Sequence, residues 1–450
     1  MRKLNHALLA SALALACASC TAEKEANYQV IPLPQEVSLT QGNPFKLNEN
    51  VLIAYPENNA LLQRNAEFLS EYIQQATNYA PKTKAIAAGE QVKNAIVLGL
   101  DPGIANKEGY VLTTTPEGIS INGQTENGVF YGIQTLRKSI PAEAKGATVL
   151  IPAGEIKDEP RFSYRGMHLD VGRHFFPKEF IKKYIDLLAL HNMNTFHWHL
   201  TEDQGWRIEI KKYPLLTEIG SCRVDRPGKT FPERRNPRQG EPTVEKGFYT
   251  QDEIREIVRY AQERHIEVIP EIEMPAHSNA ALAAYPLLSC PVVDKFIGVL
   301  PGLGGNHADV IFCAGNDSVF TFLQDILDEV LELFPSKYIH LGGDEARKTH
   351  WEECPLCQTR MKAESLENTE ELQGYFMARV ARYVQNKGRE VIGWDELTNA
   401  RIPEGSIILG WQGYGQAALK AAELGHRFIM TPARILYLIR YQGPQWFEPI

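Results

Sequence analysis

The chain has 450 residues, of which 44% are hydrophobic and 23% are charged, a balance typical of a globular protein. Its length allows two or three domains, or one large barrel with an additional domain. A formal net charge of −8 argues against a nucleic-acid ligand and against a generally basic membrane-binding surface. After the N-terminal leader, the sequence contains no stretch long and apolar enough to span a bilayer.

The first 20 residues differ in composition from the rest of the chain. In MRKLNHALLASALALACASC, two basic residues precede a leucine- and alanine-rich stretch and then small residues, the pattern of a secretory signal. The stretch ends at Cys20 in what resembles a bacterial lipoprotein cleavage site, with Cys17 as a weaker candidate. We therefore expect an exported protein, in the periplasm or at the cell surface, anchored to the outer membrane through a lipid on Cys20. Plain secretion is the alternative, and residues 21–27 are expected to be a polar tether.

Residues 28–155 are expected to form a small α/β domain that carries no catalytic residues. Residues 58–77 place Leu61, Leu62 and Ile73 at helical spacing. The segments NAIVLGL, GYVLTTT and GISINGQ are strand-like and bounded by Gly, Pro and Asn. NGVFYGIQTLRKSI predicts a second helix, so this region should combine a sheet with two helices.

From residue 160 to residue 450, strand-like segments alternate with amphipathic helices. The expected strands are 165–171, 193–200, 266–272, 337–341, 390–394, 406–411 and 427–431. The clearest helix is SVFTFLQDILDEVLELF, whose apolar residues fall on one face. Such alternation predicts parallel βα units, and seven strands favour a (β/α)₈ TIM barrel over an open sheet. An eighth unit does not follow, so we expect a barrel that lacks its last βα unit.

Residues able to do chemistry gather at the predicted carboxyl ends of these strands, where such a barrel places its catalytic groups. In chain order the strand ends carry Asp170, Arg173 and His174; His197, His199, Glu202 and Asp203; Glu271, Glu273 and His277; Asp344 and Glu345; Trp394; Trp411; and Tyr437. Acids, an arginine and aromatic rings on one face suit a neutral ligand with many hydroxyl groups. A sugar is the expected ligand class.

Some of these residues also have simpler explanations. One of His197 and His199 could be a hydrogen-bonded core residue, and Glu271 could be an ion-pair partner of Arg165 or Arg173. HWH is also a zinc-ligand pattern of barrel hydrolases, but no other strand supplies complementary His and Asp residues. Metal-dependent hydrolysis is therefore the weaker alternative, and we expect no metal or other cofactor in the reaction.

Five cysteines remain after the leader. Cys354 and Cys357 form a CxxC pair that could be half of a zinc site, but no second pair stands at matching spacing, so a local disulfide is favoured. Cys290 and Cys313 could pair across the loop between them. The sequence leaves the connectivity open.

The segment HLGGDEARKTHW, residues 340–351, ends a strand on two glycines and then presents Asp344 and Glu345 side by side. Retaining glycosidases commonly place two carboxyl groups on opposite sides of the scissile bond. Adjacent residues on an extended backbone point in diverging directions, so this pair is poorly arranged for that mechanism. Glu345 is expected to be the general acid with Asp344 beside it. The nucleophile then comes from the substrate: a 2-acetamido carbonyl oxygen attacks C1 while Asp344 stabilises the amide N–H.

These motifs together resemble those of a known family. YRGMHLDVGRHFF, NTFHWHLTEDQGWRIEI, PEIEMPAH and HLGGDEARKTHW are similar to the signatures of glycoside hydrolase family 20, the β-N-acetylhexosaminidases. NGVFYGIQTL resembles the end of that family's non-catalytic N-terminal domain. The resemblance covers nearly the whole mature chain. It implies exo-acting removal of terminal β-linked GlcNAc or GalNAc from glycans, by substrate-assisted retaining hydrolysis through an oxazoline-like intermediate.

The resemblance also implies roles at matching positions. Asp344 and Glu345 would be the polarising residue and the general acid. Arg173 would hold the 3- and 4-hydroxyls of the sugar. The other residues expected in substrate binding or its support are Asp170, Glu202, Glu273, His277, Trp394, Trp411 and Tyr437, with both tryptophans at the acetamido pocket and the tyrosine on the acetamido oxygen.

Two departures from the family pattern change the expectations. The family has Tyr-x-Asp after the seventh strand, whereas Ile439 stands in place of that Asp here, next to Arg440. Recognition at C4 and C6 should differ, and an arginine there could suit a sugar with a 6-sulfate. The absent eighth unit favours a second hypothesis from another class, a glycan-binding lipoprotein with impaired catalysis. The intact Asp344–Glu345 pair favours the enzyme.

Overall fold

The computed structural model describes residues 22–400 and 403–439. The predicted leader and Cys20 lie outside them. The chain divides into two compact units: residues up to Arg165, with the short pieces Ala189–Met193 and Glu263–His265, form one, and the remainder forms the other. Within the described residues, no helix has both the length and the apolar character needed to cross a membrane.

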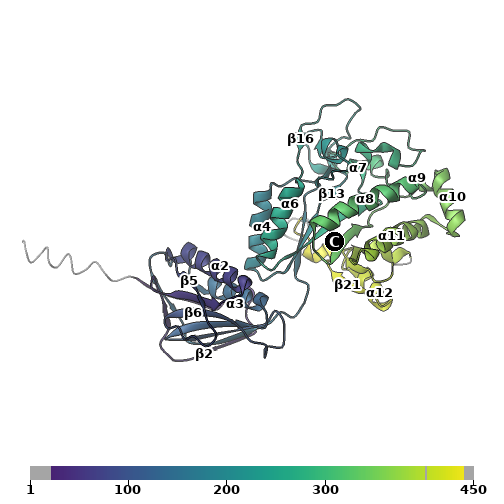
Figure 1. Cartoon of the computed structure of the whole chain (residues 1–450). Helices are drawn as coiled ribbons and strands as arrows, with labels where there is room; N and C mark the ends of the chain where they lie inside the picture. Colours follow the sequence, from purple (N-terminus) through teal and green to yellow (C-terminus); the bar gives the residue numbers. More distant parts are fainter. Residues whose placement is uncertain (1–21, 401–402, 440–450) are drawn as a thin grey trace, which may run out of the picture. The chain divides into compact units, whose positions relative to one another are not determined.

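The first unit is an α/β sandwich of one large sheet and two helices. Its seven strands lie in the order β2 (Glu36–Leu39), β10 (Gly154–Asp158), β7 (Tyr110–Thr115), β8 (Gly118–Gly123), β6 (Ala95–Leu100), β4 (Leu52–Pro56) and β5 (Lys82–Ile86). Helices α2 (Ala60–Thr77) and α3 (Glu126–Ser139) lie together against one face of this sheet (Figure 1). A smaller sheet joins β1 (Glu23–Glu25), β9 (Thr148–Ile151) and β3 (Phe45–Leu47).

Two local expectations in this unit were wrong. The segment expected to be a polar tether contains β1, which pairs in parallel with β9 from Glu23 opposite Thr148 to Glu25 opposite Leu150. Because all three side chains of β1 are exposed, their polar composition hides a segment held by backbone hydrogen bonds. In α2, Leu62 and Ile73 are buried as expected, but Leu61 is 50% exposed.

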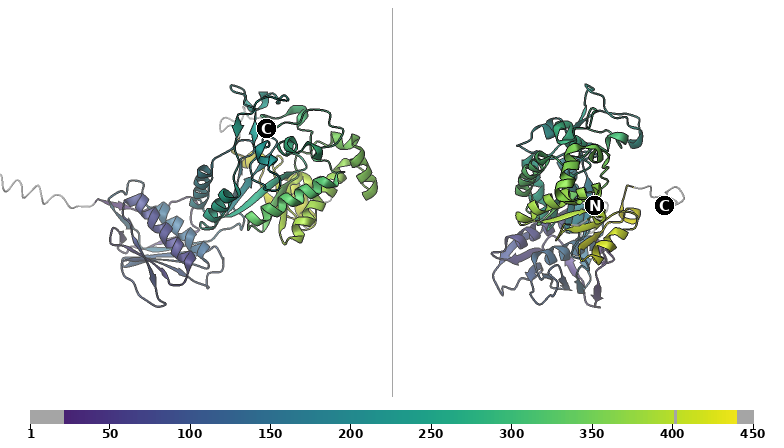
Figure 2. Two further views of the ribbon diagram at one scale, coloured as in Figure 1. Left: turned by 45° about the horizontal axis from the view of Figure 1, so that its top comes forward. Right: turned by 90° about the vertical axis from the view of Figure 1, so that its right-hand side faces the viewer.

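The second unit is built on one parallel sheet whose seven strands follow one another in chain order. They are β11 (Gly166–Asp170), β12 (Thr195–His199), β17 (Glu267–Met274), β18 (Tyr338–Gly342), β19 (Glu390–Trp394), β20 (Ile407–Gly410) and β21 (Arg427–Met430). All seven strands predicted from the sequence are therefore confirmed. Figure 2 shows the unit from two further sides, with the colour running from teal to yellow along the chain.

Helices follow the strands, as expected of βα units. The main ones are α4 (Lys178–Leu190), α6 (Gln251–Gln262), α8 (Asp317–Leu333), α11 (Thr369–Asn386) and α12 (Gln416–Glu423). Shorter ones are α5 (Leu215–Glu218), α7 (Asn279–Ala284), α9 (Thr349–Glu353), α10 (Pro355–Glu364) and α13 (Ala433–Leu436). Helix α8 begins at the cap Asn316, whose side chain accepts the N–H of Ser318, and buries the predicted apolar face.

This arrangement is the curved parallel sheet of a (β/α)₈ barrel. Among residues 22–400 and 403–439, β11 and β21 form the two edges of the sheet. Parallel strands in chain order bring all their carboxyl ends to one side of the sheet, so side chains separated by up to 270 positions can meet there.

Candidate active site

The two glycines at the end of β18 allow a close approach that no other residue would permit. Gly342 has φ +67° and Gly343 has φ +101°, in the region that L-residues rarely adopt. A β-carbon on Gly342 would lie 1.9 Å from Oε2 of Glu273. The glycine therefore lets a carboxylate from β17 pack against the backbone at the end of β18.

The acids that follow these glycines converge on one histidine. Nε2 of His277 lies 3.4 Å from Oδ2 of Asp344 and 3.4 Å from Oε2 of Glu345. We call these three residues the acid site. The sequence suggested that the acids diverge, as on an extended backbone. They converge instead because Glu345 has a left-handed φ of +48°, which turns its side chain toward His277.

The exposure of the two acids differs, in a way that fits different tasks. The Glu345 side chain is 57% exposed, whereas that of Asp344 is 15% exposed. Oδ1 of Asp344 is buried and has no hydrogen-bond partner. Because a buried acceptor without a donor is costly, this oxygen is suited to receive an N–H group from a ligand.

His277 is fixed by an acid behind it. Its Nδ1 lies 2.7 Å from Oε1 of Glu202, a carboxylate with no exposed side-chain surface. Burial would lower the pKa of His277, but Glu202 and Asp344 outweigh burial and hold that pKa well above its ordinary value. Burial would likewise raise the pKa of Glu202, but Arg173 and His277 hold it well below its ordinary value.

Arg173 lies beside this pair. Its NH1 lies 2.6 Å from Oδ2 of Asp170 and 3.2 Å from Oε2 of Glu202. Asp170 also accepts the backbone N–H of Arg173 at 2.9 Å. The structure thus places Asp170 and Glu202 as supports of Arg173 and His277. Glu202, fully buried, is a positioning residue.

Arg173 also borders a cavity of about 680 Å³. The lining contains three further arginines and a lysine, which makes the cavity strongly basic: Arg207, Arg223, Arg234 and Lys246. Phe175 and Phe231 contribute apolar walls.

Beneath the acid site, Glu271 is surrounded by histidines. Its Oε2 lies 3.3 Å, 2.9 Å and 2.8 Å from ring nitrogens of His168, His197 and His199. Its Oε1 lies 3.0 Å from Nδ1 of His340 and accepts Nε1–H of Trp394 at 2.8 Å. The expected ion pair of Glu271 with Arg165 or Arg173 is therefore wrong; Arg165 pairs with Glu108 at 2.9 Å.

The pKa values of two histidines beside Glu271 are shifted in opposite directions. Burial would lower the pKa of His199, but Glu271 and Asp170 raise it well above its ordinary value. Burial lowers the pKa of His197 to about 3. His168, His197 and Glu271 lie close enough to hold a metal ion. Because both oxygens of Glu271 already bind protein donors, the set is better described as a hydrogen-bonded network.

The aromatic residues expected at the acetamido pocket lie together. Trp394 is almost buried, and its ring packs 6.5 Å from that of Trp411. The ring of Tyr437 stacks on Trp411 with centroids 6.3 Å apart and planes inclined by 17°. Ile439 is 85% exposed, while Arg440 lies outside the described residues, so the expectation of a sulfated substrate stays a prediction.

Glu396 is a site residue that the sequence analysis missed. Its Oε2 accepts Nε1–H of Trp411 at 2.9 Å, and its Oε1 lies 3.5 Å from the backbone nitrogen of Glu345. Burial, with Asp344 adding to it, raises the pKa of Glu396 to about 8. Its position directly after the fifth strand, in GWDE, was the signal that could have found it.

The expected disulfides are not present. All five cysteines among the described residues are free thiols, and four of them gather in one buried group: Cys290, Cys313, Cys354 and Cys357. The sequence suggested Cys354–Cys357 and Cys290–Cys313 as two separate candidate pairs, and did not place them together. The fold brings the two pairs together.

Comparison with known proteins identifies the family. The model of glycosyl hydrolase family 20, catalytic domain, matches residues 162–450, and that of domain 2 of the same family matches residues 27–159. The chain belongs to glycosyl hydrolase family 20. The resemblance seen in the motifs is thus confirmed.

Individual members of family 20 agree with this assignment. The chain is 41% identical to a beta-hexosaminidase of Porphyromonas gingivalis over 436 residues, 95% of this chain and 53% of that one. A crystal structure of beta-N-acetylhexosaminidase from Bacteroides fragilis matches with a TM-score of 0.75 at 34% identity, covering 92% of this chain and 77% of that chain. An exo beta-N-acetylglucosaminidase from Vibrio harveyi, in complex with N-acetylglucosamine, matches with a TM-score of 0.80 at 28% identity, covering 96% and 65%. The chain spans about half the length of the first curated relatives it matches.

Proposed function

We propose that this chain is an exo-acting β-N-acetylhexosaminidase that removes terminal β-linked GlcNAc or GalNAc from glycans with retention of configuration. The observation that carries the proposal is the acid site. Asp344 and Glu345 lie 3.4 Å from the same nitrogen of His277, and Asp344 keeps a buried oxygen without a partner. An acetamido N–H is a donor that would satisfy this oxygen.

In the first step the acetamido carbonyl oxygen of the substrate bonds to C1 while the glycosidic C1–O bond breaks. Glu345 gives its proton to the leaving oxygen, a task that suits an exposed carboxyl group beside the aglycone. The amide nitrogen gains positive charge, and its N–H donates to Asp344. The carboxylate is fixed there before the charge develops, so its attraction strengthens in the transition state.

In the second step water attacks C1 of the oxazoline-like intermediate from the side that the aglycone has left. The carboxylate of Glu345 now takes the proton of the water, and the bond from C1 to the acetamido oxygen breaks. Two inversions at C1 give a product of unchanged configuration. Family 20 is an exception to the scheme with two protein carboxyl groups, because the substrate supplies the nucleophile.

Other residues orient the sugar. Arg173, held by Asp170 and Glu202, offers donors to hydroxyl groups of the terminal sugar. Trp411 and the ring of Tyr437 stacked on it offer an apolar wall for the acetamido methyl group. A relative supports the substrate class: the Vibrio harveyi enzyme is an exo beta-N-acetylglucosaminidase with N-acetylglucosamine bound.

The test compares two substrates that differ only at C2, an aryl β-N-acetylglucosaminide and the matching aryl β-glucoside. We expect release of the aryl group from the acetamido sugar alone, because only that sugar carries the nucleophile. Equal cleavage of both would show a protein nucleophile and contradict the mechanism. Binding without cleavage of either would favour a glycan-binding protein with impaired catalysis, an alternative that the intact acid site disfavours.

We further propose that the protein is exported and anchored to a membrane through a lipid on Cys20. The support is the leader sequence alone, since residues 1–21 lie outside the described part of the chain. Detergent fractionation of cells that produce the protein or its Cys20→Ala variant tests this. The protein should move from the membrane fraction to the soluble fraction on substitution, whereas an unchanged distribution would contradict the anchor.

A further inference from the structure

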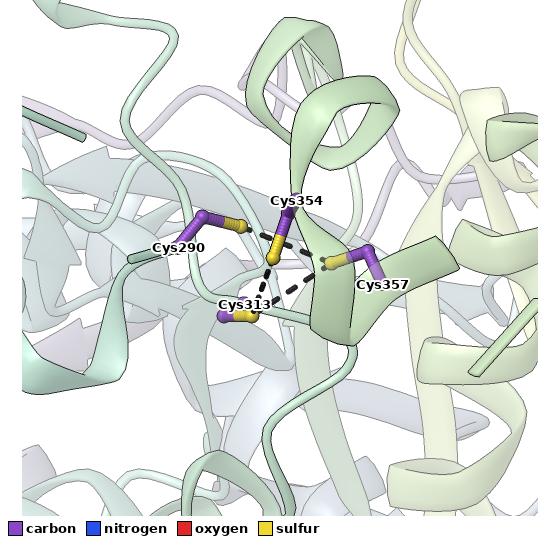
Figure 3. Close-up of side chains that lie close together, drawn as sticks. All are labelled: Cys290, Cys313, Cys354 and Cys357. Atoms are coloured by element: carbon purple, nitrogen blue, oxygen red, sulfur yellow. Dashed lines mark hydrogen bonds between the residues drawn. The ribbon is translucent and has the colours of Figure 1, made fainter. Parts of the chain in front are cut away.

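Four buried cysteines from distant parts of the second unit point their sulfur atoms at a common centre (Figure 3). Cys290 follows the short 3₁₀ helix η2 (Pro286–Leu288), and Cys313 stands just before α8. Cys354 and Cys357 lie where α9 ends and α10 begins. All four are at most 1% exposed. We call them the cysteine cluster.

The spacing of the sulfur atoms is that of a tetrahedral metal site. The Sγ atoms of Cys290 and Cys357 lie 3.8 Å apart, and Cys313 lies 3.7 Å from both Cys354 and Cys357. All four Sγ atoms lie within 4.8 Å of one another. Four thiolates at a Zn–S distance of about 2.3 Å stand about 3.8 Å apart when they form a regular tetrahedron. The three sulfur–sulfur distances given above match that edge length.

The backbone holds Cys290 and Cys313 next to each other before any ligand is considered. Ser289 and Phe312, the residues directly preceding them, form an antiparallel bridge. The N–H of Cys313 donates to the carbonyl of Leu288 at 2.9 Å. These two cysteines therefore act as a second pair, equivalent to a CxxC turn but assembled from separate segments.

The two pairs are brought together by a glycine. A β-carbon on Gly315 would lie 2.1 Å from the carbonyl carbon of Leu356 and 2.4 Å from the nitrogen of Cys357. Only glycine lets the turn after Cys313 lie against the turn between Cys354 and Cys357. The buried Trp351 also joins the segments, because its Nε1–H donates to the carbonyl of Phe312 at 2.9 Å.

The N-terminus of one helix borders the cysteine cluster. Cys354 caps the N-terminus of α10, a helix of 10 residues, and Cys357 lies in its first turn. Free N–H groups and the dipole at that end stabilise thiolates. Four thiolates with a divalent cation leave two negative charges, which these donors would offset.

We propose that Cys290, Cys313, Cys354 and Cys357 bind a zinc ion in a closed tetrahedral site with a structural role. Zn²⁺ favours four thiolates in this geometry, and a site with four protein ligands has no open position for substrate or water. The inference stands apart from the proposed activity, since none of its four ligands belongs to the acid site.

The zinc site would join two connections of the barrel. The connection after β17 carries His277, Cys290 and Cys313, and the connection after β18 carries the acids and then Cys354 and Cys357. A zinc ion would crosslink these connections behind the acid site. Because the ligands are assembled only in the folded chain, zinc binding would add to the stability of the fold.

Two other states of the cluster make different predictions. In a pair of disulfides each sulfur has a single partner, whereas Cys313 and Cys357 each have two neighbours at nearly equal distance. Four uncharged thiols would act as small apolar residues, but packing alone does not require their sulfur atoms to meet at one point. Metal content and the oxidation state of the thiols separate these states.

The first experiment measures both on the purified full chain, with elemental analysis and with alkylation followed by intact mass. We expect one zinc ion per chain. Among the cysteines of residues 22–400 and 403–439, only Cys222, which is partly exposed, should react with the alkylating agent in the native protein. After unfolding in the presence of a chelator, the four cysteines of the cluster should react as well. Zinc should be released when the chain unfolds. The measurement of zinc and of reactive thiols does not depend on enzymatic activity.

Variants connect the metal to the cluster. Cys354→Ser should lose the zinc and lower the melting temperature, whereas Cys222→Ser, the matched control, should keep both. If Cys354→Ser does not fold, zinc content and thiol count of the unchanged protein still decide the question. Two disulfides without metal, four thiols without metal, or iron in place of zinc would each overturn the proposal.

Discussion

The connections that follow β17 and β18 meet at two places, and these differ in almost every physical property. At the acid site, charged side chains face one another, Glu345 is more than half exposed, and an oxygen of Asp344 lacks a partner. At the cysteine cluster, four side chains of one type are buried, and their sulfur atoms lie within 4.8 Å of one another. The first place is open to a ligand, and the second is closed.

The acid site and the cysteine cluster thus suit two different tasks, catalysis and stabilisation of the fold. A catalytic site needs groups whose interactions are completed only by the transition state, so it cannot be fully satisfied in the free protein. Such a site costs stability, and the nearby connections must be held by other contacts. The cysteine cluster supplies such contacts, because a site with all ligands satisfied contributes to folding. Substitutions at the two places should therefore affect different measurements.

The largest effect is expected for Glu345→Gln. An amide cannot deliver the proton to the leaving oxygen, so kcat should fall by roughly 10²–10⁴-fold. The melting temperature should stay unchanged, since the side chain is 57% exposed. Kinetics on an aryl β-N-acetylglucosaminide and a thermal melt check both. Glu352→Gln, an exposed glutamate on α9, is the matched control and should keep full activity. An unchanged kcat in Glu345→Gln would contradict the role of Glu345 as the general acid.

Glu202→Gln should lower the free energy of unfolding, because Glu202 is the buried partner of Arg173 and His277. Removing one partner of a fully buried charge pair costs about 3–5 kcal/mol. The pKa of Glu202 is lowered in the folded protein, so its contribution is present above its ordinary value of 4.5 and is lost as the pH falls. The pKa of His277 is raised, so its contribution is present below its ordinary value of 6.5 and is lost as the pH rises through the raised pKa.

The free energy of unfolding of Glu202→Gln should thus differ most from that of the unchanged protein between pH 4.5 and 6.5. Denaturant titrations across this range measure it. An equal difference at every pH would show that Glu202 stabilises the fold by packing alone, without its charge.

Gly342→Ala tests the close approach at the end of β18. A left-handed φ costs a non-glycine residue about 1–3 kcal/mol, and the collision with Glu273 adds to this. Gly388→Ala is a matched control, because Gly388 has φ +79° but no atom within 4 Å of its β-carbon. We expect both to lose stability but only Gly342→Ala to lose activity, by displacing Glu273. Equal activity in both variants would contradict the role of the close approach.

The smallest effect is expected at Ile439, which is 85% exposed. Ile439→Asp restores the Tyr-x-Asp pattern of the family after the seventh strand. A new hydrogen bond to a sugar hydroxyl contributes roughly 1 kcal/mol, so KM for an unsulfated substrate should fall a few-fold. The measurement compares KM for the 6-sulfated sugar with KM for the unsulfated sugar, in the unchanged protein and in Ile439→Asp. No preference for the sulfated sugar in the unchanged protein would contradict the sulfate hypothesis.

Much of the barrel could be predicted because the five inner strands of its sheet are largely buried and bounded by turns. Each of the seven predicted strands is present, and the residues at their ends lie on the side where the acid site forms. β1 was missed because all of its side chains are exposed, so its strand has no alternating pattern. Glu396 was missed because only Trp394 was taken from the GWDE segment after the fifth strand, whereas the burial and the neighbouring Asp344 that raise the pKa of Glu396 arise only in the fold.

The sequence by itself determined the order of the βα units, the residues at the strand ends and the family motifs, since these depend on local periodicity and spacing. Only the tertiary structure decided that His277 joins both acids, that Glu271 binds histidines instead of arginine, and that two single cysteines complete a CxxC pair. The physical reason is the same in each case. Such contacts link residues far apart in the chain, and their partners are chosen by burial and by backbone approach, which spacing along the sequence does not record.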